Sequence, residues 1–509
     1  MSPSSIVTMH QTHLKIGIIQ SFPLTADFSG NLRRVVQGYR ECLDRGAELV
    51  VAPATALCGL APMDLAGRRS FMAQTRDALN ALAAELSDTP LLLGAWSSLL
   101  PDEAEARARV LTSFEVDPTE RVESLTPASV VTPFLLCRDC VTELGDAELS
   151  DMLGRRVYVD INDNLTLLEE GERPDLIIHL ATGAWHRRSR RREEERCRWE
   201  ARHHHCPVVC CRAVGTAEGQ VYGGSSIVCS SEGEVLMRLP AFQEMNAVAD
   251  TVRAARRSAA EGSEQDEMAE AICRGIADSV HGRDYAGVCI LGDLRHSALL
   301  AALCAKTIGP ERVLCVSFDL SSGAASGVLR VPGVRRMQWD LEPLMQALPR
   351  ELDELAREAA RPRLAGALLS SLAEQEGLLL LSPLSRQELM TGQFTLYGES
   401  CGGLLPFGEL YDHELAGLGA RMGLAPAPDG EAEDREQRIA LIIHEMANLN
   451  HSPGSLIHQA GHCYPEHEVR FVQRRMAAGE AGRRQLPPVL HLTPDCQQLY
   501  FPIRHRLND

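Results

Sequence analysis

The sequence predicts an α/β fold in two domains. Two observations carry this prediction. Short apolar runs of strand length alternate with longer segments of helical periodicity, and the alternation occurs on both sides of a polar segment near residue 250. A chain of 509 residues is also too long for one ordinary hydrophobic core. We therefore expect two α/β domains joined by a linker.

The first half of the chain, residues 1–245, is expected to form the first domain. Its opening elements are a strand at 14–20, with the sequence LKIGIIQ, and a helix at 29–47 that has Gly46 near its end. Further strands are expected at 48–54, 90–96, 155–161 and 174–181, and further helices at 75–88 and 187–205. The domain closes with a hairpin at 225–242 that turns at Glu232 and Gly233.

Residues 246–265 become small, polar and charged, so we place the linker there and the second domain at 266–509. A helix at 266–284 leads into VCILGDLRHSALLAAL (288–303), which indicates a buried strand, a tight turn and a helix from Ser297. Strands are then expected at 312–318, 335–341 and 378–383, a helix at 362–377, a mostly helical segment from about 405, and a tail strand near 486–494.

Composition excludes several classes of protein. A formal net charge of −18 argues against a nucleic-acid-binding protein, and no apolar run is long enough to span a membrane. The 16 cysteines are diluted in a long chain without a secretory pattern at its start, which indicates reduced thiols in a cytoplasmic protein. The chain has only two lysines, Lys15 and Lys306, so a mechanism that needs a lysine has few candidates.

Five stretches carry a resemblance to a known family: KIGIIQSFPLTADFSGNL, ELVVAPATALCGLAPMDL and GGSSIVCSSEGEVLMRLPAF in the first half, and residues 388–407 and 483–507 in the second. Together, and in this order, they resemble glutamine-dependent NAD synthetases over nearly the whole chain. The resemblance implies a nitrilase-like (carbon–nitrogen hydrolase) αββα sandwich, followed by a doubly wound parallel-sheet domain similar to adenine nucleotide α-hydrolases.

The activity that the resemblance implies has two steps. The first domain of such enzymes releases ammonia from glutamine, and the second uses it to amidate nicotinate adenine dinucleotide after activation by ATP. ATP and magnesium are therefore the cofactors expected if binding or activity is retained. Family members self-associate, so the resemblance also implies a homo-oligomer.

The amidase site of the family needs a cysteine nucleophile, a glutamate base and a lysine that stabilises the oxyanion. In this chain Ala54 stands at the position of the glutamate, and Asp160 or Ile161 at that of the cysteine. The lysine is expected around residues 115–135, where the chain has none. Cys58, four residues beyond Ala54, is a possible substitute nucleophile, although packing is the more common role of a thiol in such a loop.

The ATP pyrophosphate loop of the family has the pattern Ser-Gly-Gly-x-Asp-Ser at the strand–helix turn. This chain has Gly292, Asp293, Leu294, Arg295, His296 and Ser297 at these positions. An acid and bulky side chains replace glycines that let phosphate oxygens approach backbone amides, although Arg295 could offset the charge of Asp293.

Other family positions in the second half are partly kept. Glu388 is retained, while Arg386 and Glu399 replace a lysine and an aspartate. Arg361 and Arg363 are retained and could contact an anionic ligand. The sequence predicts no metal site: the CRDC stretch (137–140), the HHHC cluster (203–206) and HQAGHCYPEH (458–467) each have ligand residue types without a convincing arrangement.

Two functional hypotheses follow. In the first, the chain is a non-catalytic NAD synthetase homologue, a pseudoenzyme that binds, regulates or scaffolds, with an active NAD synthetase paralogue or further copies of itself as partner. In the second, it is a divergent but active synthetase that uses glutamine or ammonia. We favour the first, because ammonia dependence would explain the changed amidase positions but not the changed ATP loop. Neither hypothesis involves nucleic acid or a membrane.

Overall fold

The computed structural model describes residues 13–98, 129–144, 148–161, 173–254, 259, 262–318, 331–424, 431–449, 451–458 and 464–493. The chain divides into two compact units. The first comprises Met1–Ala217 and Tyr222–Gly262, and the second comprises Glu218–Val221 and Ser263–Asp509. Both units are α/β, as the sequence predicts.

Two six-stranded sheets form the first unit. One has the order β14-β1-β2-β3-β4-β5 and the other the order β13-β12-β9-β8-β7-β6. The strands of the first sheet are β1 (Lys15–Gln20), β2 (Leu49–Val51), β3 (Leu91–Ser98), β4 (Ser129–Cys137), β5 (Cys140–Glu143) and β14 (Met245–Asp250). Those of the second are β6 (Glu148–Met152), β7 (Arg155–Asp160), β8 (Leu176–Ala181), β9 (Val208–Arg212), β12 (Ile227–Cys229) and β13 (Val235–Arg238). A separate two-stranded pair joins β10 (Val214–Ala217) to β11 (Gln220–Gly223).

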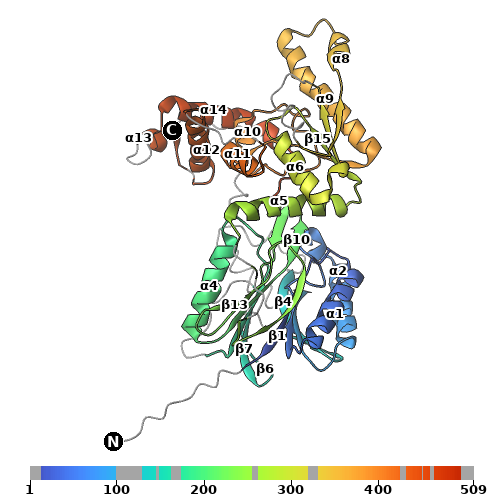
Figure 1. Ribbon diagram of the computed structural model, residues 1–509, viewed down its shortest axis with the longest axis vertical. Helices are drawn as coiled ribbons and strands as arrows, with labels where there is room; N and C mark the ends of the chain where they lie inside the picture. The colour runs from blue at the N-terminus through green and yellow to red at the C-terminus, as the bar shows by residue number, and fades with distance from the viewer. Residues whose placement is uncertain are drawn as a thin grey trace, which may run out of the picture. The chain divides into compact units, whose positions relative to one another are not determined.

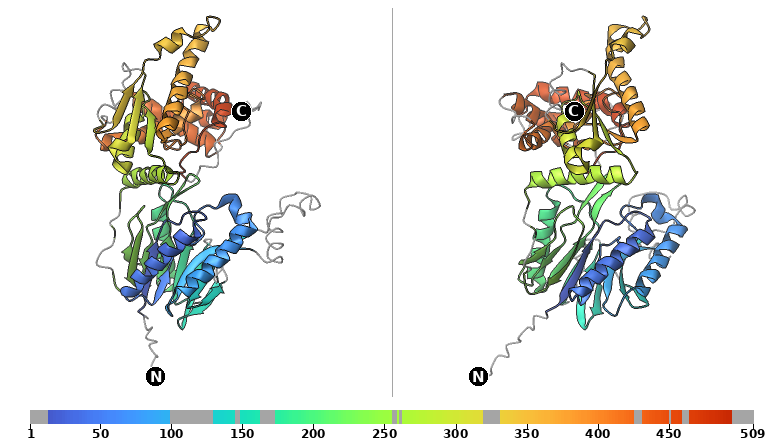
Figure 2. Two further views of the ribbon diagram at one scale, coloured as in Figure 1. Left: turned by 90° about the vertical axis from the view of Figure 1, so that its right-hand side faces the viewer. Right: turned by 45° about the vertical axis from the view of Figure 1, so that its right-hand side comes forward.

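Helices cover the outer face of each sheet. Helices α1 (Phe28–Asp44) and α2 (Arg69–Ala84) lie on the first sheet, and α4 (Ser189–His204) lies on the second, with the sheets between them (Figures 1 and 2). Three apolar clusters fill the spaces: one under α1 and α2, one between the sheets, and one under α4. This is the αββα sandwich that the resemblance implies.

The predicted linker is partly wrong. Met245–Asp250 forms β14, which pairs antiparallel with β1 along its whole length. Ala247 and Ala249 are buried while their neighbours are not, so the segment has the two-residue alternation of a half-buried strand. Alanine is only weakly hydrophobic, so this alternation is hard to recognise in the sequence, and the composition of the segment is typical of a linker. The first unit therefore continues to Gly262.

A four-stranded parallel sheet forms the centre of the second unit, in the order β17-β16-β15-β18. Its strands are β15 (Gly287–Leu291), β16 (Val313–Ser317), β17 (Arg335–Gln338) and β18 (Leu378–Leu381). In chain order this is a 3-2-1-4 arrangement, the start of a doubly wound sheet. The chain reverses direction across the sheet between β15 and β18, and ligands of such sheets bind beyond the carboxyl ends of the strands at this point.

Helices surround this sheet and continue beyond it. The helices of the sheet region are α5 (Glu264–His281), α6 (Ser297–Ile308), α8 (Glu342–Gln346) and α9 (Glu354–Glu376). The remaining helices are α10 (Arg386–Thr391), α11 (Asp412–Arg421), α12 (Glu431–Ala447), α13 (Pro453–His458) and α14 (Glu466–Arg483). Helix α9 packs on β15, β16 and β18 (Figure 2).

Two predicted elements of this unit differ from the structure. Helix α9 begins at Glu354 rather than near residue 362, because Asp353 caps it and Pro362 lies inside the helix. The predicted tail strand is reduced to isolated bridges, in which Val489 pairs with Leu405 and His491 with Gln220.

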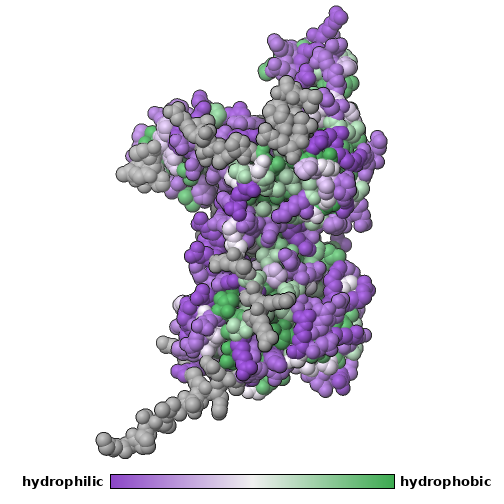
Figure 3. Space-filling view, in the orientation of Figure 1, coloured by the Kyte–Doolittle hydropathy of each residue, from purple (hydrophilic) through white to green (hydrophobic). Residues whose placement is uncertain are grey.

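The face of the molecule shown in Figure 3 is mainly hydrophilic. On the face shown in Figure 3, apolar side chains occupy limited areas among polar ones. Among the described residues, no helix combines the length and the apolar character that crossing a bilayer requires.

Candidate nucleotide and amidase sites

The predicted ATP loop lies where the doubly wound sheet should bind a ligand. Residues 292–297 directly follow β15, and α10 begins at Arg386, five residues after the end of the neighbouring strand β18. Parallel strands end at the same edge of the sheet, so the two segments lie side by side. The predicted loop positions and the retained Glu388 therefore belong to one site.

The side chains of the turn form hydrogen bonds and packing contacts with other residues of the same domain. The Asp293 carboxylate accepts a hydrogen bond of 2.6 Å from the backbone N–H of Phe318, at the end of β16. The Ser297 hydroxyl donates to the carbonyl of Leu291 at 2.6 Å. Leu294 packs against the apolar cluster under α9. Gly292 has little room, since a Cβ there would lie 2.4 Å from the Ser317 Oγ.

Arg295 and His296 are both tied to Asp412, the first residue of α11. Arg295 Nη1 lies 3.1 Å from Asp412 Oδ2, and its Nη2 lies 2.8 Å from Glu436 on α12. His296 Nε2 lies 3.0 Å from Asp412 Oδ1. Burial by itself raises the pKa of Asp412, but the hydrogen bond with His296 and the charge of Arg295 outweigh it and lower that pKa. The turn is thus held by an ion-pair network of its own domain.

Arg386 and Glu388, at the start of α10, have structural partners. The Arg386 side chain is 1% exposed, donates to the Asn448 side chain at 2.7 Å and lies over the ring of Tyr411. Glu388 forms a capping box with Ser385, accepting from its backbone N–H at 2.8 Å. Burial raises the pKa of Glu388.

The other residues predicted to contact a ligand in the second domain form hydrogen bonds or ion pairs with nearby residues of that domain. Arg361 pairs with Glu342 at 3.2 Å, and Arg363 donates to the carbonyl of Ala359 at 2.8 Å, both on the exposed side of α9. The Glu399 carboxylate accepts from the backbone N–H of Thr395 at 2.7 Å.

In the first domain, the structure separates the two positions predicted for the nucleophile. Ala54 and Ile161 are both about 2% exposed and belong to the apolar cluster between the sheets. Asp160, one residue earlier, faces the opposite side of the sheet, toward α4. The position that shares a cluster with Ala54 is therefore Ile161. Neither side chain carries a nucleophile, a base or a hydrogen-bonding group.

Asp160 instead belongs to a buried network that the sequence did not reveal. His179, on β8, lies 3.0 Å from Asp160 through Nδ1 and 2.6 Å from Glu200, on α4, through Nε2. All three side chains are 1% exposed. Burial alone lowers the pKa of His179, but the two carboxylates reverse this effect and raise the pKa to about 10. The imidazole is therefore protonated at neutral pH and links β7, β8 and α4.

Cys58 lies in a different cluster from Ala54 and Ile161. It is fully buried under α1 and α2, and burial raises the pKa of its thiol to about 11. The cysteines of the CRDC stretch face each other across the turn between β4 and β5, as the pair Cys137 and Cys140. The predicted lysine region lies mostly in residues 99–128, outside the described part of the chain.

The HHHC cluster ends α4 without forming a ligand group. His203 stacks on the exposed Trp199, with ring centroids 4.7 Å apart, and His204 meets His203 edge-on. Cys206 is buried, and burial raises the pKa of its thiol to about 12. Of the segment 458–467, residues 459–463 lie outside the described residues.

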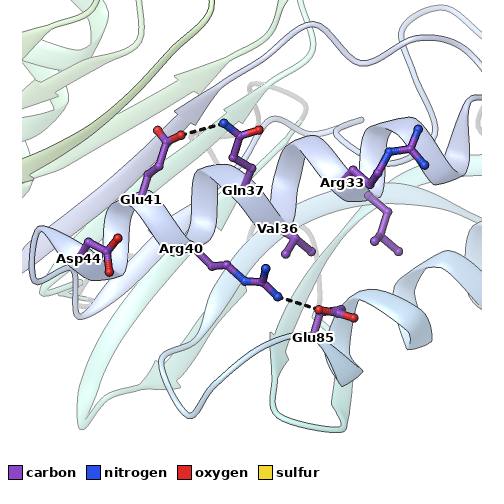
Figure 4. A pocket seen from close by; sticks show the side chains of 8 residues that line it. Arg33, Val36, Gln37, Arg40, Glu41, Asp44 and Glu85 are labelled. Carbon is purple, nitrogen blue, oxygen red and sulfur yellow. Dashed lines mark hydrogen bonds and ion pairs between the residues drawn. The ribbon is translucent and has the colours of Figure 1, made fainter.

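A shallow hollow of about 390 Å³ on the surface of α1 involves none of the predicted site positions. As Figure 4 shows, Arg40 reaches across it to Glu85, and Gln37 contacts Glu41. These are solvent-exposed polar pairs of a helix surface, so the hollow is not the candidate site.

Comparison with known proteins identifies the family. Residues 268–429 match the family model described as NAD synthase. A glutamine-dependent NAD(+) synthetase of Synechocystis sp. is 24% identical over 432 residues, which cover 76% of this chain and 77% of that protein. An NH(3)-dependent NAD(+) synthetase of Hyperthermus butylicus is 30% identical over 230 residues, which cover 40% of this chain and 81% of that protein. This chain belongs to the NAD synthetase family. A glutamine-dependent NAD(+) synthetase structure from Cytophaga hutchinsonii superposes with a TM-score of 0.77 at 13% identity, over 97% of this chain and 98% of that one. The ADP complex of the enzyme from Acinetobacter baumannii superposes with a TM-score of 0.68 at 18% identity, with the same coverage.

The NAD synthetase pattern predicts a site at the turn 292–297, but it does not predict which residues contact the side chains of that turn. Asp412 and Glu436 are 116 and 141 residues from the turn that they bind, and no local spacing connects them to it. His179 and Glu200 were missed for a similar reason, since each was read as part of a strand or of a charged helix face. A single polar residue inside an apolar strand, as His179 is in LIIHLA, was the one available signal.

Proposed function

We propose that this chain is an NAD synthetase homologue that does not synthesise NAD and acts as a binding, regulatory or scaffold protein. The observation that carries the proposal is the state of the turn at 292–297. Its polar side chains are bound to groups of the same domain, where the family pattern has glycines and hydroxyls open to phosphate.

The charge of the turn supports this proposal. Asp293 places a carboxylate at a position where the family has glycine, and at a few ångströms it would cost an anionic ligand about 1 kcal/mol or more. Arg295 would be the natural compensating cation, but it is shared between Asp412 and Glu436. ATP binding at this turn would require these ion pairs to break first.

The amidase positions support the same conclusion. Ala54 and Ile161 provide no base and no thiol, and Cys58 lies beyond a different face of the sheet. Lys15 and Lys306, the two lysines of the chain, lie on β1 and on α6 of the second domain. Hydrolysis of an amide by the family mechanism needs all three groups together.

A scaffold without turnover would act through partners. We propose further copies of this chain, or an active NAD synthetase paralogue whose fold it shares, in the cytoplasm. The described cysteines are free thiols, which is compatible with a reducing compartment. ATP and magnesium would be ligands only if the turn opens.

The test is an assay of the purified full-length protein with nicotinate adenine dinucleotide, ATP, magnesium and either glutamine or ammonia. We expect no NAD above the no-protein control, while the Synechocystis relative serves as the positive control. Formation of NAD from either nitrogen source would refute the proposal and establish a divergent synthetase.

Thermal-shift titration with ATP separates binding from turnover. We expect no saturable stabilisation of the wild type. The variant Asp293→Gly/Leu294→Gly, which restores the two glycines of the family pattern, should show a larger ATP-dependent shift than the wild type. A wild-type shift equal to that of the variant would contradict the view that these side chains block the turn.

A further inference from the structure

Two cysteines face each other at the edge of the first sheet of the first unit. Cys137 is the last residue of β4 and Cys140 is the first residue of β5, and the two are directly opposite in the antiparallel register. Strand β5 is the outermost strand of this sheet, after β4. The pair belongs neither to the turn at 292–297 nor to the amidase positions, so it does not depend on the proposed function.

Both cysteine side chains project from the same face of the sheet. Leu136 and Val141, the neighbours of the two cysteines, are also opposite each other and pack into the apolar cluster under α1 and α2. Successive side chains of a strand point to opposite faces of a sheet. Cys137 and Cys140 therefore share the face that points away from these helices. The Cys140 Sγ lies 3.8 Å from the Oγ1 of Thr142, two residues further along the same face.

The separation of the two residues suits a disulfide. Directly opposite residues of antiparallel strands have Cα atoms about 4.5 or 5.5 Å apart, depending on the hydrogen-bond pattern. Disulfides join residues whose Cα atoms are about 4.4–6.8 Å apart. A bond between Cys137 and Cys140 therefore needs little movement of the backbone.

Contacts with the end of α2 hold the turn between the two cysteines in place. The backbone N–H of Arg138 donates to the carbonyl of Ser87 at 3.1 Å. The backbone N–H of Asp139 donates to the carbonyl of Ala83, also at 3.1 Å. The two thiols are thus kept opposite each other by the fold as well as by their short spacing in the sequence.

The two thiols differ in exposure, which gives them different roles. Cys140 is exposed, whereas Cys137 is half-buried. Burial and the neighbouring Cys140 thiol both raise the pKa of Cys137. Cys140 is therefore the thiol that a dissolved reagent meets first, and Cys137 is placed to react with it afterwards. By contrast, Cys197 and Cys210 under α4 are both fully buried, so a reagent would reach them only after this layer opens.

We propose that Cys137 and Cys140 form a reversible disulfide by exchange with a small dissolved disulfide of the glutathione class. The Cys140 thiolate attacks one sulfur of the incoming disulfide RSSR, whose S–S bond breaks to release RS⁻ and leave a mixed disulfide on Cys140. Cys137 then loses its proton to water and attacks the Cys140 sulfur, and the mixed S–S bond breaks to release the second RS⁻. The two cysteines are oxidised, and RSSR is reduced to two RSH, which take up the two protons that the cysteines released. An excess of RSH reverses both steps.

The experiment incubates the reduced full-length protein in buffers with different ratios of reduced to oxidised glutathione, then quenches with acid and alkylates the remaining thiols. Arg138 lies between the two cysteines, so trypsin separates them, and a disulfide between them appears in mass spectrometry as two linked peptides. We expect this linked pair in protein that runs as a monomer on a non-reducing gel. An excess of reduced glutathione should remove it.

Single variants separate the two steps. Cys137→Ser should complete only the first step and carry glutathione on Cys140 at a level at least about tenfold above the wild type, in which the second thiol is at high effective concentration. Cys140→Ser should carry much less glutathione, because its remaining thiol is half-buried. Cys273→Ser removes a half-buried thiol of α5 that contacts the carbonyl of Leu303, so it is the matched control and should form the linked pair as the wild type does.

The same titration in urea gives a second measurement that does not depend on the folding of the variants. The equilibrium constant for the linked pair should be at least about tenfold larger in the native protein, because the folded hairpin keeps the thiols opposite each other. The proposal is overturned if both thiols stay reduced at every ratio, or if the wild type carries as much glutathione on Cys140 as Cys137→Ser does. It is also overturned if Cys140 links to a second chain instead of Cys137, or if native and unfolded protein form the linked pair equally readily.

Discussion

The buried contact between His179, Asp160 and Glu200 makes the sharpest prediction about stability. Replacing His179 with glutamine removes the imidazolium that lies between two carboxylates that are each 1% exposed, while Glu200 keeps its 3.6 Å contact with Arg196. Breaking a buried ion pair by removing one partner costs about 3–5 kcal/mol. We expect His179→Gln to lower the unfolding free energy of the first domain by that amount at neutral pH.

The dependence on pH follows from the raised pKa of His179. Folding raises the pKa from 6.5 to about 10, so the stabilisation is complete below pH 6.5 and is lost as the pH rises through 10. Each pKa unit corresponds to about 1.4 kcal/mol, which gives about 5 kcal/mol for the whole range. The wild type should therefore lose stability between neutral and alkaline pH, while His179→Gln should lose much less.

The assay needs a local probe, because the chain has two domains. Cys197 lies on α4 and is fully buried beneath it, so its labelling by an alkylating agent during a brief pulse reports the opening of this layer. Urea titrations with peptide mass spectrometry, near pH 7 and near pH 10, give the midpoint for each variant. Glu195→Gln is the matched control: it removes an exposed pair with Arg191 on the same helix and should cost under about 1 kcal/mol. If His179→Gln has the stability of the control, or the pH dependence of the wild type, this account of the network is wrong.

Three further predictions concern single residues. Cys58 should resist alkylation in the native protein at neutral pH, because burial raises the pKa of its thiol to about 11. Rapid modification of Cys58, measured by mass spectrometry, would contradict its packing role. Gly94→Ala should destabilise the first domain by about 1–3 kcal/mol, since its Cβ would lie 2.4 Å from the carbonyl oxygen of Ala54, and a denaturation midpoint equal to that of the wild type would refute this. Arg386→Lys restores the residue of the family pattern, but it should lower the midpoint of thermal unfolding. Lysine cannot reproduce both the contact with Asn448 and the stacking on the ring of Tyr411. An unchanged midpoint would contradict this structural role of Arg386.

Apolar periodicity predicted the fold well, because the buried strands consist of consecutive apolar residues. The strand at 288–291 and the hairpin turning at Glu232 and Gly233 could be read in this way, and the Gly233 backbone has the positive φ of +74° that such a turn uses. Strand β14 could not, because Ala247 and Ala249 carry too little hydrophobicity to mark a buried face. Local pattern therefore fails where small residues form the core.

The site was predictable only as a set of positions. The family pattern predicts a site at the turn 292–297, but the contacts of Arg295 and His296 depend on Asp412 and Glu436, which are far away in the sequence. Glu200 shows the same limit. It lies in a charged segment of α4 whose pattern predicts a solvated residue, yet its side chain is 1% exposed and contacts His179 on strand β8. Long-range polar pairing leaves no local signature.

The polar side chains at the positions predicted for the two sites share a property: each has a partner in the structure. Asp293, Arg295 and His296 each have a hydrogen-bond or ion-pair partner within their own domain, and Asp160 has one in the other. Polar groups that drift into a protein interior without partners cost about 1–3 kcal/mol each, and charges cost more. Several such substitutions together would approach the whole stability of a typical domain. The partners of these four side chains therefore explain how polar and charged groups are accommodated at these positions without a large loss of stability.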